Sequence, residues 1–255
     1  YLNGGIQVSE SDSEKYHQYL ILPAIAAHPN PKRILIIGEG DGGGLFQVLK
    51  YPFEVIDHVE LDETVINVSR QYLDKIQHGA LDNPRIKRYI QDGRRFIHNA
   101  PKNYYDIIVL AFPDPYTLRL ATLYTKEFFA SAKEILSENG ILVTQTADVD
   151  QDRGDQRYLA AQACILQTLR SVFSYAFAYR TTIPSFWTGN SFMIAGKSQD
   201  PRVVRNNDIS LREWYNPNRR AEMFSLTDVI EEYLKYNKVF LNTQTNPMLH
   251  VYMHP

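Results

Sequence analysis

Cysteine is almost missing from this 255-residue chain, and Cys164 is the only one. A single cysteine excludes an intramolecular disulfide and a zinc site built from several cysteines. An excess of either charge is missing too, because 27 basic residues face 29 acidic ones and the formal net charge is −2. We therefore expect no nucleic-acid partner bound through bulk charge.

Long apolar runs are also lacking. The longest one, residues 19–27, contains Pro23 and is too short to cross a bilayer. The sequence shows no transmembrane helix and no signal peptide, which favours a cytoplasmic protein. Because the chain begins at Tyr1 rather than at methionine, a targeting or membrane segment could lie upstream, and the protein would then sit at the cytoplasmic face of a membrane.

What the sequence does have is a regular alternation of short, Ile- and Val-rich runs with helix-length amphipathic stretches. The runs predict strands over 33–38, 55–61, 86–90, 105–111, 141–146, 175–182 and 191–195. The stretches predict helices over 43–50, 63–72, 94–98, 125–136 and 156–173. Alternation of this kind implies right-handed crossovers and a mostly parallel sheet with helices on both faces. We therefore predict an α/β, Rossmann-like fold.

The two ends of the chain depart from this alternation. Residues 1–9 predict a short β segment that leads into a helix capped by Ser13, and Asn139-Gly140 is expected to separate a helix from a strand. Residues from about 201 carry turn signals and then a helix near 226–236. We divide the chain into an N-terminal segment, 1–30, which is the remnant of a small domain, and a Rossmann-like domain, 31–255, with a C-terminal appendage.

A glycine-rich turn follows the first predicted strand. Gly38, Gly40 and Gly43 match the spacing G-x-G-x-x-G, with Gly42 between them, and Glu60 ends the next strand. Glycines let the backbone turn sharply and let a ligand approach it, and an acid at the end of the second strand accepts hydrogen bonds from ribose hydroxyls. A tight turn without a ligand would explain the glycines but not Glu60, so the pattern predicts a nucleoside site.

Acidic residues near this turn narrow the choice of nucleotide. A dinucleotide places its pyrophosphate at the helix N-terminus, where Asp41 would repel it, whereas a sulfonium or a primary ammonium suits that acid. Asp92 and Gly93 follow the third strand. Asp92 can accept a hydrogen bond from an adenine amine or can act as a helix N-cap ahead of Arg94, and both roles stay open. An S-adenosyl-type ligand at the carboxyl ends of the strands fits best.

Several segments together resemble the spermidine synthase family, aminopropyltransferases that use decarboxylated S-adenosylmethionine. They occur in the family's order along nearly the whole chain: 2–10 with Tyr16 and His17, 38–43 with Glu39 replacing the middle glycine, 59–62, 92–93, 113–115, 123–129 and 140–145. The Phe-Pro-Asp-Pro form of residues 112–115 and the ending 242–252 are most similar to the branch fused behind a multi-helix membrane region.

The resemblance implies a methyltransferase-like nucleoside-binding catalytic domain, a small amine substrate, methylthioadenosine as product and a homodimer. It also implies a role for each matching residue. Ribose would be held by Gln7 and Glu60, adenine by Asp92, and the aminopropyl ammonium by Asp41; Tyr16 and His17 would line the cleft, and Asp114 would bind the acceptor and take its proton.

Three positions on the acceptor side depart from the family. Ala111 stands where an Asp is expected, Phe186 replaces a Tyr, and Ala147 replaces an acid, with Asp148 beside it. We expect a retained sulfonium-nucleoside pocket with a rewritten acceptor pocket, and an acceptor that is larger or less charged than putrescine. Asp114 is then the carboxylate left in its loop to act as a base.

Alternatives remain open at this point. The same pocket could bind intact S-adenosylmethionine and let its own amine or carboxylate attack the γ-carbon, which would release methylthioadenosine without an acceptor. A non-catalytic nucleoside-binding domain is the other alternative; a methyltransferase and an NAD dehydrogenase fit less well. We expect no metal site, because the seven histidines are not at ligand spacing with acids.

Overall fold

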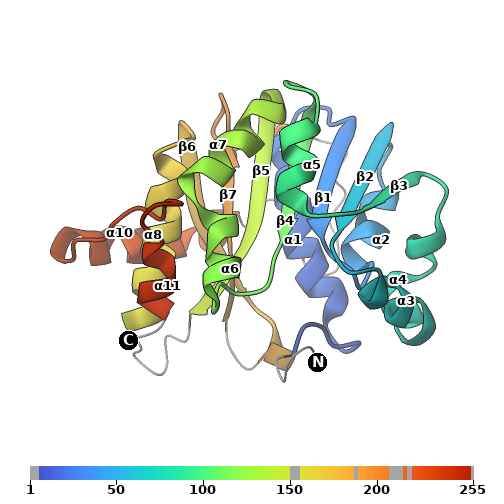
Figure 1. Cartoon of the computed structure of the whole chain (residues 1–255), viewed down its shortest axis with the longest axis horizontal. Coiled ribbons are helices and arrows are strands. Elements are labelled where there is room, and N and C mark those ends of the chain that lie inside the picture. The colour runs from blue at the N-terminus through green and yellow to red at the C-terminus, as the bar shows by residue number, and fades with distance from the viewer. Residues whose placement is uncertain (1–5, 150–155, 187–188, 207–214, 217–219, 254–255) are drawn as a thin grey trace.

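The structure is a computed structural model that describes residues 6–149, 156–186, 189–206, 215–216 and 220–253. Its centre is one sheet of seven strands in the order β3-β2-β1-β4-β5-β7-β6 (Figure 1). The strands are β1 Arg33–Gly38, β2 Val55–Glu60, β3 Ile86–Ile90, β4 Tyr105–Ala111, β5 Leu136–Val149, β6 Tyr175–Thr182 and β7 Gly189–Gly196. Strands β1 to β5 pair in parallel, and β7 is antiparallel to both of its neighbours. The predicted Rossmann-like α/β fold is confirmed.

Helices cover both faces of this sheet (Figure 1). They are α1 Ser13–Ala27, α2 Gly43–Leu49, α3 Glu63–Tyr72, α4 Asp74–Gln77, α5 Gly93–Asn99, α6 Leu118–Ala121, α7 Lys126–Ile135, α8 Gln156–Arg170, α9 Arg220–Met223, α10 Ser225–Tyr236 and α11 Met248–Met253. Short 3₁₀ turns occur at η1 Ala80–Asp82, η2 Thr122–Tyr124 and η3 Pro184–Phe186. In the part of the chain that is described, no helix has the length and hydropathy that a membrane span requires.

Strand β1 shows why the sequence folds into three layers. Successive side chains of a strand point to opposite faces. Ile34 and Ile36 therefore join the apolar core beneath α1 and α2, while Leu35 and Ile37 join the core that contains residues of α5, α7 and α8. All four are buried, because a parallel sheet with helices on both faces has no face that is exposed to solvent.

Two local predictions, about the cap of α1 and about the start of β5, are wrong, and the predicted N-terminal β segment is tested only over residues 6–9. Residues 6–9 have no regular structure, since no described strand pairs with them, and residues 1–5 lie outside the described part. Ser13 is the first residue of α1 rather than its cap; Asp12 stands at the cap, but its carboxylate accepts hydrogen bonds from Ser185 instead, 2.8 Å from N and 2.7 Å from Oγ. Residues 139–140 lie inside β5, because Leu136 already pairs with Tyr105 across an irregular register.

The C-terminal residues pack against the same sheet, where α10 contacts α8 and β6. Arg220 of α9 fastens this region to α1. Its guanidinium is buried and donates to the carbonyl oxygens of Pro23, Pro201 and Arg202 and to the Tyr215 hydroxyl. Four acceptors around one buried cation make this residue a structural anchor.

Replacing that anchor tests how strongly the C-terminal region is held. We expect Arg220→Met to lower the free energy of unfolding by at least ~2 kcal/mol, since each buried acceptor left without a donor costs about 1–3 kcal/mol. Denaturant unfolding measures the change. The matched control is Arg95→Met on the exposed face of α5, which should shift stability by less than about 0.5 kcal/mol. Equal effects of the two changes would contradict the anchoring role.

Candidate functional site

The glycine-rich turn between β1 and α2 is a sharp backbone reversal at the carboxyl end of the sheet. Gly38, Glu39 and Gly42 all have positive φ, at 88°, 72° and 83°. A side chain at Gly38 would come closer to the backbone oxygen of Ala111 than real side chains do. This turn therefore needs glycine at position 38 for packing against β4 as well as for its backbone angles.

Other glycines of this region make room for side chains of the protein itself. A Cβ at Gly43 would overlap the His17 ring, and one at Gly44 would lie 2.6 Å from Glu39 Oε1. At Gly40 it would lie 2.6 Å from Val65 and 3.2 Å from Glu60 Oε2. The sequence suggested that these glycines admit a ligand. The structure adds a second reason, since Gly43 leaves space for His17 and Gly44 leaves space for Glu39.

Three side chains from two separate parts of the sequence meet at the start of α2. The Nε2 atom of His17 lies 3.1 Å from Glu39 Oε1 and 3.1 Å from Asp41 Oδ1. His17 and Glu39 are buried, and the Asp41 side chain is 17% exposed. The N-terminal amides of α2 bind both acids: Gly43 N donates to Asp41 Oδ1 over 2.8 Å, and Gly44 N donates to Glu39. We call these three residues the triad.

The triad holds its histidine in the charged form. Burial opposes protonation of His17, but the negative charges of Glu39 and Asp41 outweigh it and raise the pKa of His17 well above its ordinary value. Burial and the charge of Asp41 raise the pKa of Glu39. Burial opposes ionisation of Asp41 as well, yet its contact with His17 lowers the pKa of this acid.

The same three residues are a group that could hold a metal ion, since their ligand atoms lie within 4.8 Å of one another. From the sequence we predicted no metal site. That prediction considered only the spacing of histidines and acids along the chain. His17 lies on α1, whereas Glu39 and Asp41 lie in the turn after β1, so sequence spacing gave no sign of the cluster. The 3.1 Å separations are ion-pair distances between an imidazolium and two carboxylates, and this pairing of charges accounts for the arrangement.

Tyr16 connects the region of the triad with strand β5 and with η3. Its hydroxyl donates to Oε1 of Gln145, and its ring lies 4.9 Å from that of His17 and 5.7 Å from that of Phe186. Burial raises the pKa of Tyr16 well above its ordinary value, and the charges of Glu39, Asp41 and Asp114 raise it further. The charges of the two triad acids and of Asp114 therefore all act on Tyr16.

Asp114 lies among tyrosines. Its charge raises the pKa of Tyr116 and Tyr124, which burial has already raised. The hydroxyl of Tyr124 donates to the backbone oxygen of Gln145 over 3.2 Å. The same hydroxyl lies 3.4 Å from the backbone oxygen of Pro113, so Tyr124 contacts both β5 and the loop that carries Asp114.

Glu60 faces the glycine-rich turn from the end of β2. Its Oε1 accepts hydrogen bonds from the backbone amides of Leu61 (2.7 Å) and Asp62 (3.0 Å), and burial raises its pKa. The other oxygen, Oε2, points towards Gly40. Gln7 lies on the half-buried stretch before α1. Of these two predicted ribose ligands, the structure places Glu60 directly beside the turn.

Asp92 is the N-cap of α5, one of the two roles that the sequence left open. Its Oδ1 accepts from the backbone amide of Arg94 over 2.8 Å, and Oδ2 pairs with the guanidinium of Arg94 at 2.8 Å. The hydrogen bond from the Arg94 side chain is the main cause that lowers the pKa of Asp92. Gly93 is required for packing, since a Cβ there would lie 2.5 Å from Ile37.

Two of the three positions that were predicted to lie on the acceptor side can be placed near the turn and Tyr16. Ala111 pairs with Gly38 at the end of β4. Phe186 belongs to η3, which Asp12 fixes through its two hydrogen bonds to Ser185. Sequence reasoning missed Asp12, because no motif links it to a residue 173 positions away. The backbone of residues 147 and 148 belongs to β5, and their side chains lie outside the described part.

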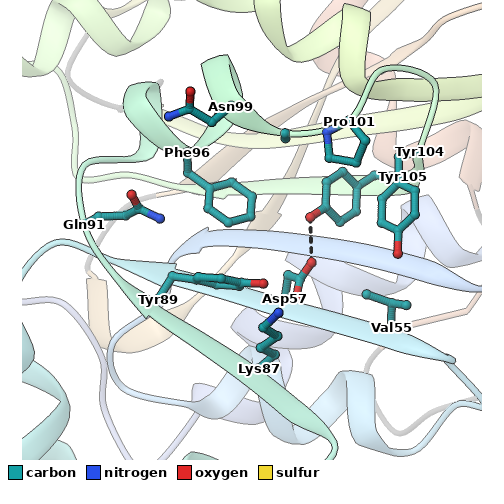
Figure 2. A pocket seen from close by; sticks show the side chains of 11 residues that line it. Val55, Asp57, Lys87, Tyr89, Gln91, Phe96, Asn99, Pro101, Tyr104 and Tyr105 are labelled. Atoms are coloured by element: carbon teal, nitrogen blue, oxygen red, sulfur yellow. Dashed lines mark hydrogen bonds between the residues drawn. The ribbon is translucent and has the colours of Figure 1, made fainter.

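A separate hollow of about 510 Å³ opens on the α5 side of the sheet (Figure 2). Strands β2 and β3, helix α5 and the start of β4 form it. Asp57 lies at its base and accepts a hydrogen bond from the Tyr105 hydroxyl over 2.6 Å. Among the residues that line it are Lys87, Tyr89, Phe96 and Tyr104. None of the predicted site residues lies there, so the hollow is distinct from the candidate site.

Comparison with known proteins agrees with this geometry. Residues 13–207 match the spermine/spermidine synthase domain. The polyamine aminopropyltransferase of Pyrobaculum calidifontis is 35% identical over 83% of this chain and 72% of its own length. Polyamine aminopropyltransferase 1 of Hyperthermus butylicus is 36% identical over 83% of this chain and 70% of its own length.

Solved structures give the same result. A spermidine synthase in complex with the transition-state analogue AdoDATO superposes with a TM-score of 0.79 at 29% identity, and the spermidine synthase of Thermotoga maritima with 0.77 at 30% identity. Each comparison covers 93% of this chain and 80% of the other. The fold, the glycine-rich turn with its acids and these matches lead to one conclusion: the chain belongs to the spermine/spermidine synthase family.

Proposed function

We propose that this protein transfers the aminopropyl group of decarboxylated S-adenosylmethionine to an amine and releases methylthioadenosine. One observation carries the proposal: the charges of Glu39, Asp41 and Asp114 all act on Tyr16. A group of carboxylates whose charges all act on one buried tyrosine suits a reaction whose two substrates are both cationic. The similarity to polyamine aminopropyltransferases supports the same reaction.

The cosubstrate would occupy the turn and the ends of the first three strands. Glu60 and Gln7 would bind the ribose, and Asp92 with Gly93 would border the adenine. Gly38, Gly40 and Gly42 shape the turn against which the nucleoside lies. Asp41 would receive the aminopropyl ammonium. The AdoDATO complex of a related spermidine synthase supports a nucleoside ligand of this type.

For the chemical step, the protein has to align the acceptor amine with the carbon attached to sulfur and to remove a proton. The lone pair of the acceptor nitrogen forms a bond to the chain carbon attached to sulfur. The carbon–sulfur bond breaks, its electron pair goes to sulfur, and methylthioadenosine leaves as a neutral thioether. The new ammonium then loses one proton to the carboxylate of Asp114 and from there to water. Tyr16 and His17 line the path between the two substrates.

The acceptor is proposed to be an amine that is larger or less charged than putrescine. Phe186 packs near Tyr16, and Ala111 supplies no charge at the end of β4. A diammonium would find fewer carboxylates there than a family member with acids at these places offers. We also propose a homodimer, and a position at the cytoplasmic face of a membrane if the chain belongs to the membrane-fused branch.

Intramolecular chemistry is the second candidate, and the apolar side chain of Phe186 near Tyr16 favours it because no second substrate has to bind. A product assay separates the two. We expect methylthioadenosine only when decarboxylated S-adenosylmethionine and an amine are both present, as measured by mass spectrometry. Release from intact S-adenosylmethionine alone would support cyclisation and contradict aminopropyl transfer. Binding without turnover would leave a nucleoside-binding domain.

Replacing the proposed base tests the mechanism. We expect Asp114→Asn to lower kcat by about 10²–10⁴-fold, the usual contribution of a general base, with a smaller change in KM for the cosubstrate. Steady-state kinetics with the best amine from the product assay measures the effect. Asp228→Asn, on the exposed side of α10, is the control and should retain full activity. Activity of Asp114→Asn close to that of the wild type would refute this role.

Restoring the missing acid tests the acceptor pocket. Ala111→Asp should raise kcat/KM for putrescine by about tenfold or more, because one added carboxylate pairs with the diammonium. Ala111→Asn adds a side chain of the same size without the charge and should not raise it. No gain with Ala111→Asp in a folded, cosubstrate-binding protein would show that position 111 does not face the acceptor.

A further inference from the structure

Glu39 occupies a backbone position that disfavours it. Its φ of 72° lies in the left-handed region, where residues with a Cβ are uncommon and strained. Glycine at this place would avoid that strain. Side-chain contacts must therefore compensate for the strain at Glu39, and such strain concentrates at functional sites.

The contacts of the Glu39 carboxylate are all internal and short. It accepts a hydrogen bond from the backbone amide of Gly44 and lies 3.1 Å from His17 Nε2. Because a Cβ at position 44 would lie 2.6 Å from Glu39 Oε1, Glu39 fills the space that a side chain at 44 would use. Glu39 and Gly44 are thus fitted to one another.

The charge count of the triad depends on this residue. Asp41 and the His17 imidazolium alone would be neutral together, and Asp41 Oδ1 already accepts from Gly43 N and contacts His17. With Glu39 ionised, the form that its contacts with His17 and the Gly44 amide favour, the triad carries one net negative charge, which matches one ammonium. His58 on β2, which also faces Asp41, adds no charge, since burial lowers its pKa to about 4. On the α2 side, His17 packs against Gly43, which adds no charge to the triad.

We propose that Glu39 is a positioning and specificity residue: it fixes His17 beside Asp41 and gives the triad the net negative charge that accepts an ammonium and repels a ligand carboxylate. The proposal rests on the proposed function, in which Asp41 receives the aminopropyl end. It explains why this end of the pocket would select decarboxylated over intact S-adenosylmethionine. Glu39 acts through His17 and Asp41.

The main test removes the charge and keeps the shape. Glu39→Gln should weaken the binding of decarboxylated S-adenosylmethionine at least tenfold in calorimetry without an acceptor, and should change the affinity for intact S-adenosylmethionine less, so that discrimination falls. Glu63→Gln, at the exposed start of α3, is the control and should alter neither affinity. Unchanged discrimination in Glu39→Gln would overturn the specificity role.

A second readout does not depend on ligand. NMR titration of the imidazole should show that the pKa of His17 falls in Glu39→Gln, because one of its two flanking charges is gone. The raised pKa in the folded wild type means that the stability from His17 is present below the ordinary histidine pKa and is lost as pH rises through the raised value. Glu39→Gln should lose less stability over that interval. If His17 titrates identically in both proteins, the inference fails even when aminopropyl transfer is confirmed.

A double-mutant cycle tests the fit between Glu39 and Gly44. Gly44→Ala should shift the denaturant midpoint of the wild type downwards, because the added Cβ overpacks the site, and should shift it clearly less in a Glu39→Gly background, where its Cβ has room. Equal costs in the two backgrounds would contradict the packing argument. If no S-adenosyl ligand binds to any variant, the proposed function fails, while the titration and this cycle still decide whether Glu39 holds His17.

Discussion

The buried contact of His17 with Glu39 and Asp41 is the constraint on which the site depends. It joins helix α1 to the turn between β1 and α2, and it works only because Gly43 and Gly44 leave space for the two larger side chains. A charge of this kind is costly in the interior unless it is paired and hydrogen-bonded. The amides at the start of α2 supply those hydrogen bonds, so the sheet edge, α1 and α2 are locked into one arrangement.

The acceptor side follows from the same arrangement. Tyr16 is the neighbour of His17 on α1, and it reaches the end of β5 through Gln145. The η3 segment is held against the start of α1 by Asp12, and it carries Phe186 to the ring of Tyr16. Ala111 and Phe186 thus lie close to this frame. Under the proposed function, this end of the site would bind the acceptor.

The sequence predicted the sheet well, because buried parallel strands appear as continuous apolar runs and each acid after a strand lies at the same edge. The predictions from sequence were wrong where the local structure depends on residues that are far apart in the sequence. The cap of α1 is Asp12 without a capping bond, since Ser185 takes its carboxylate, and β5 begins before residues 139–140 because Leu136 pairs with Tyr105. The triad was invisible for the same reason: Glu39 looked like a departure from a glycine motif, and its partner His17 lies on another element.

A crystal structure with decarboxylated S-adenosylmethionine bound tests the central claim most directly. The account predicts that the ammonium of the aminopropyl chain lies within hydrogen-bond distance of the Asp41 carboxylate, with His17 still between Asp41 and Glu39 and the ribose on Glu60. A ligand whose ammonium lies away from the triad, or a His17 that leaves the two acids when the ligand binds, would contradict it.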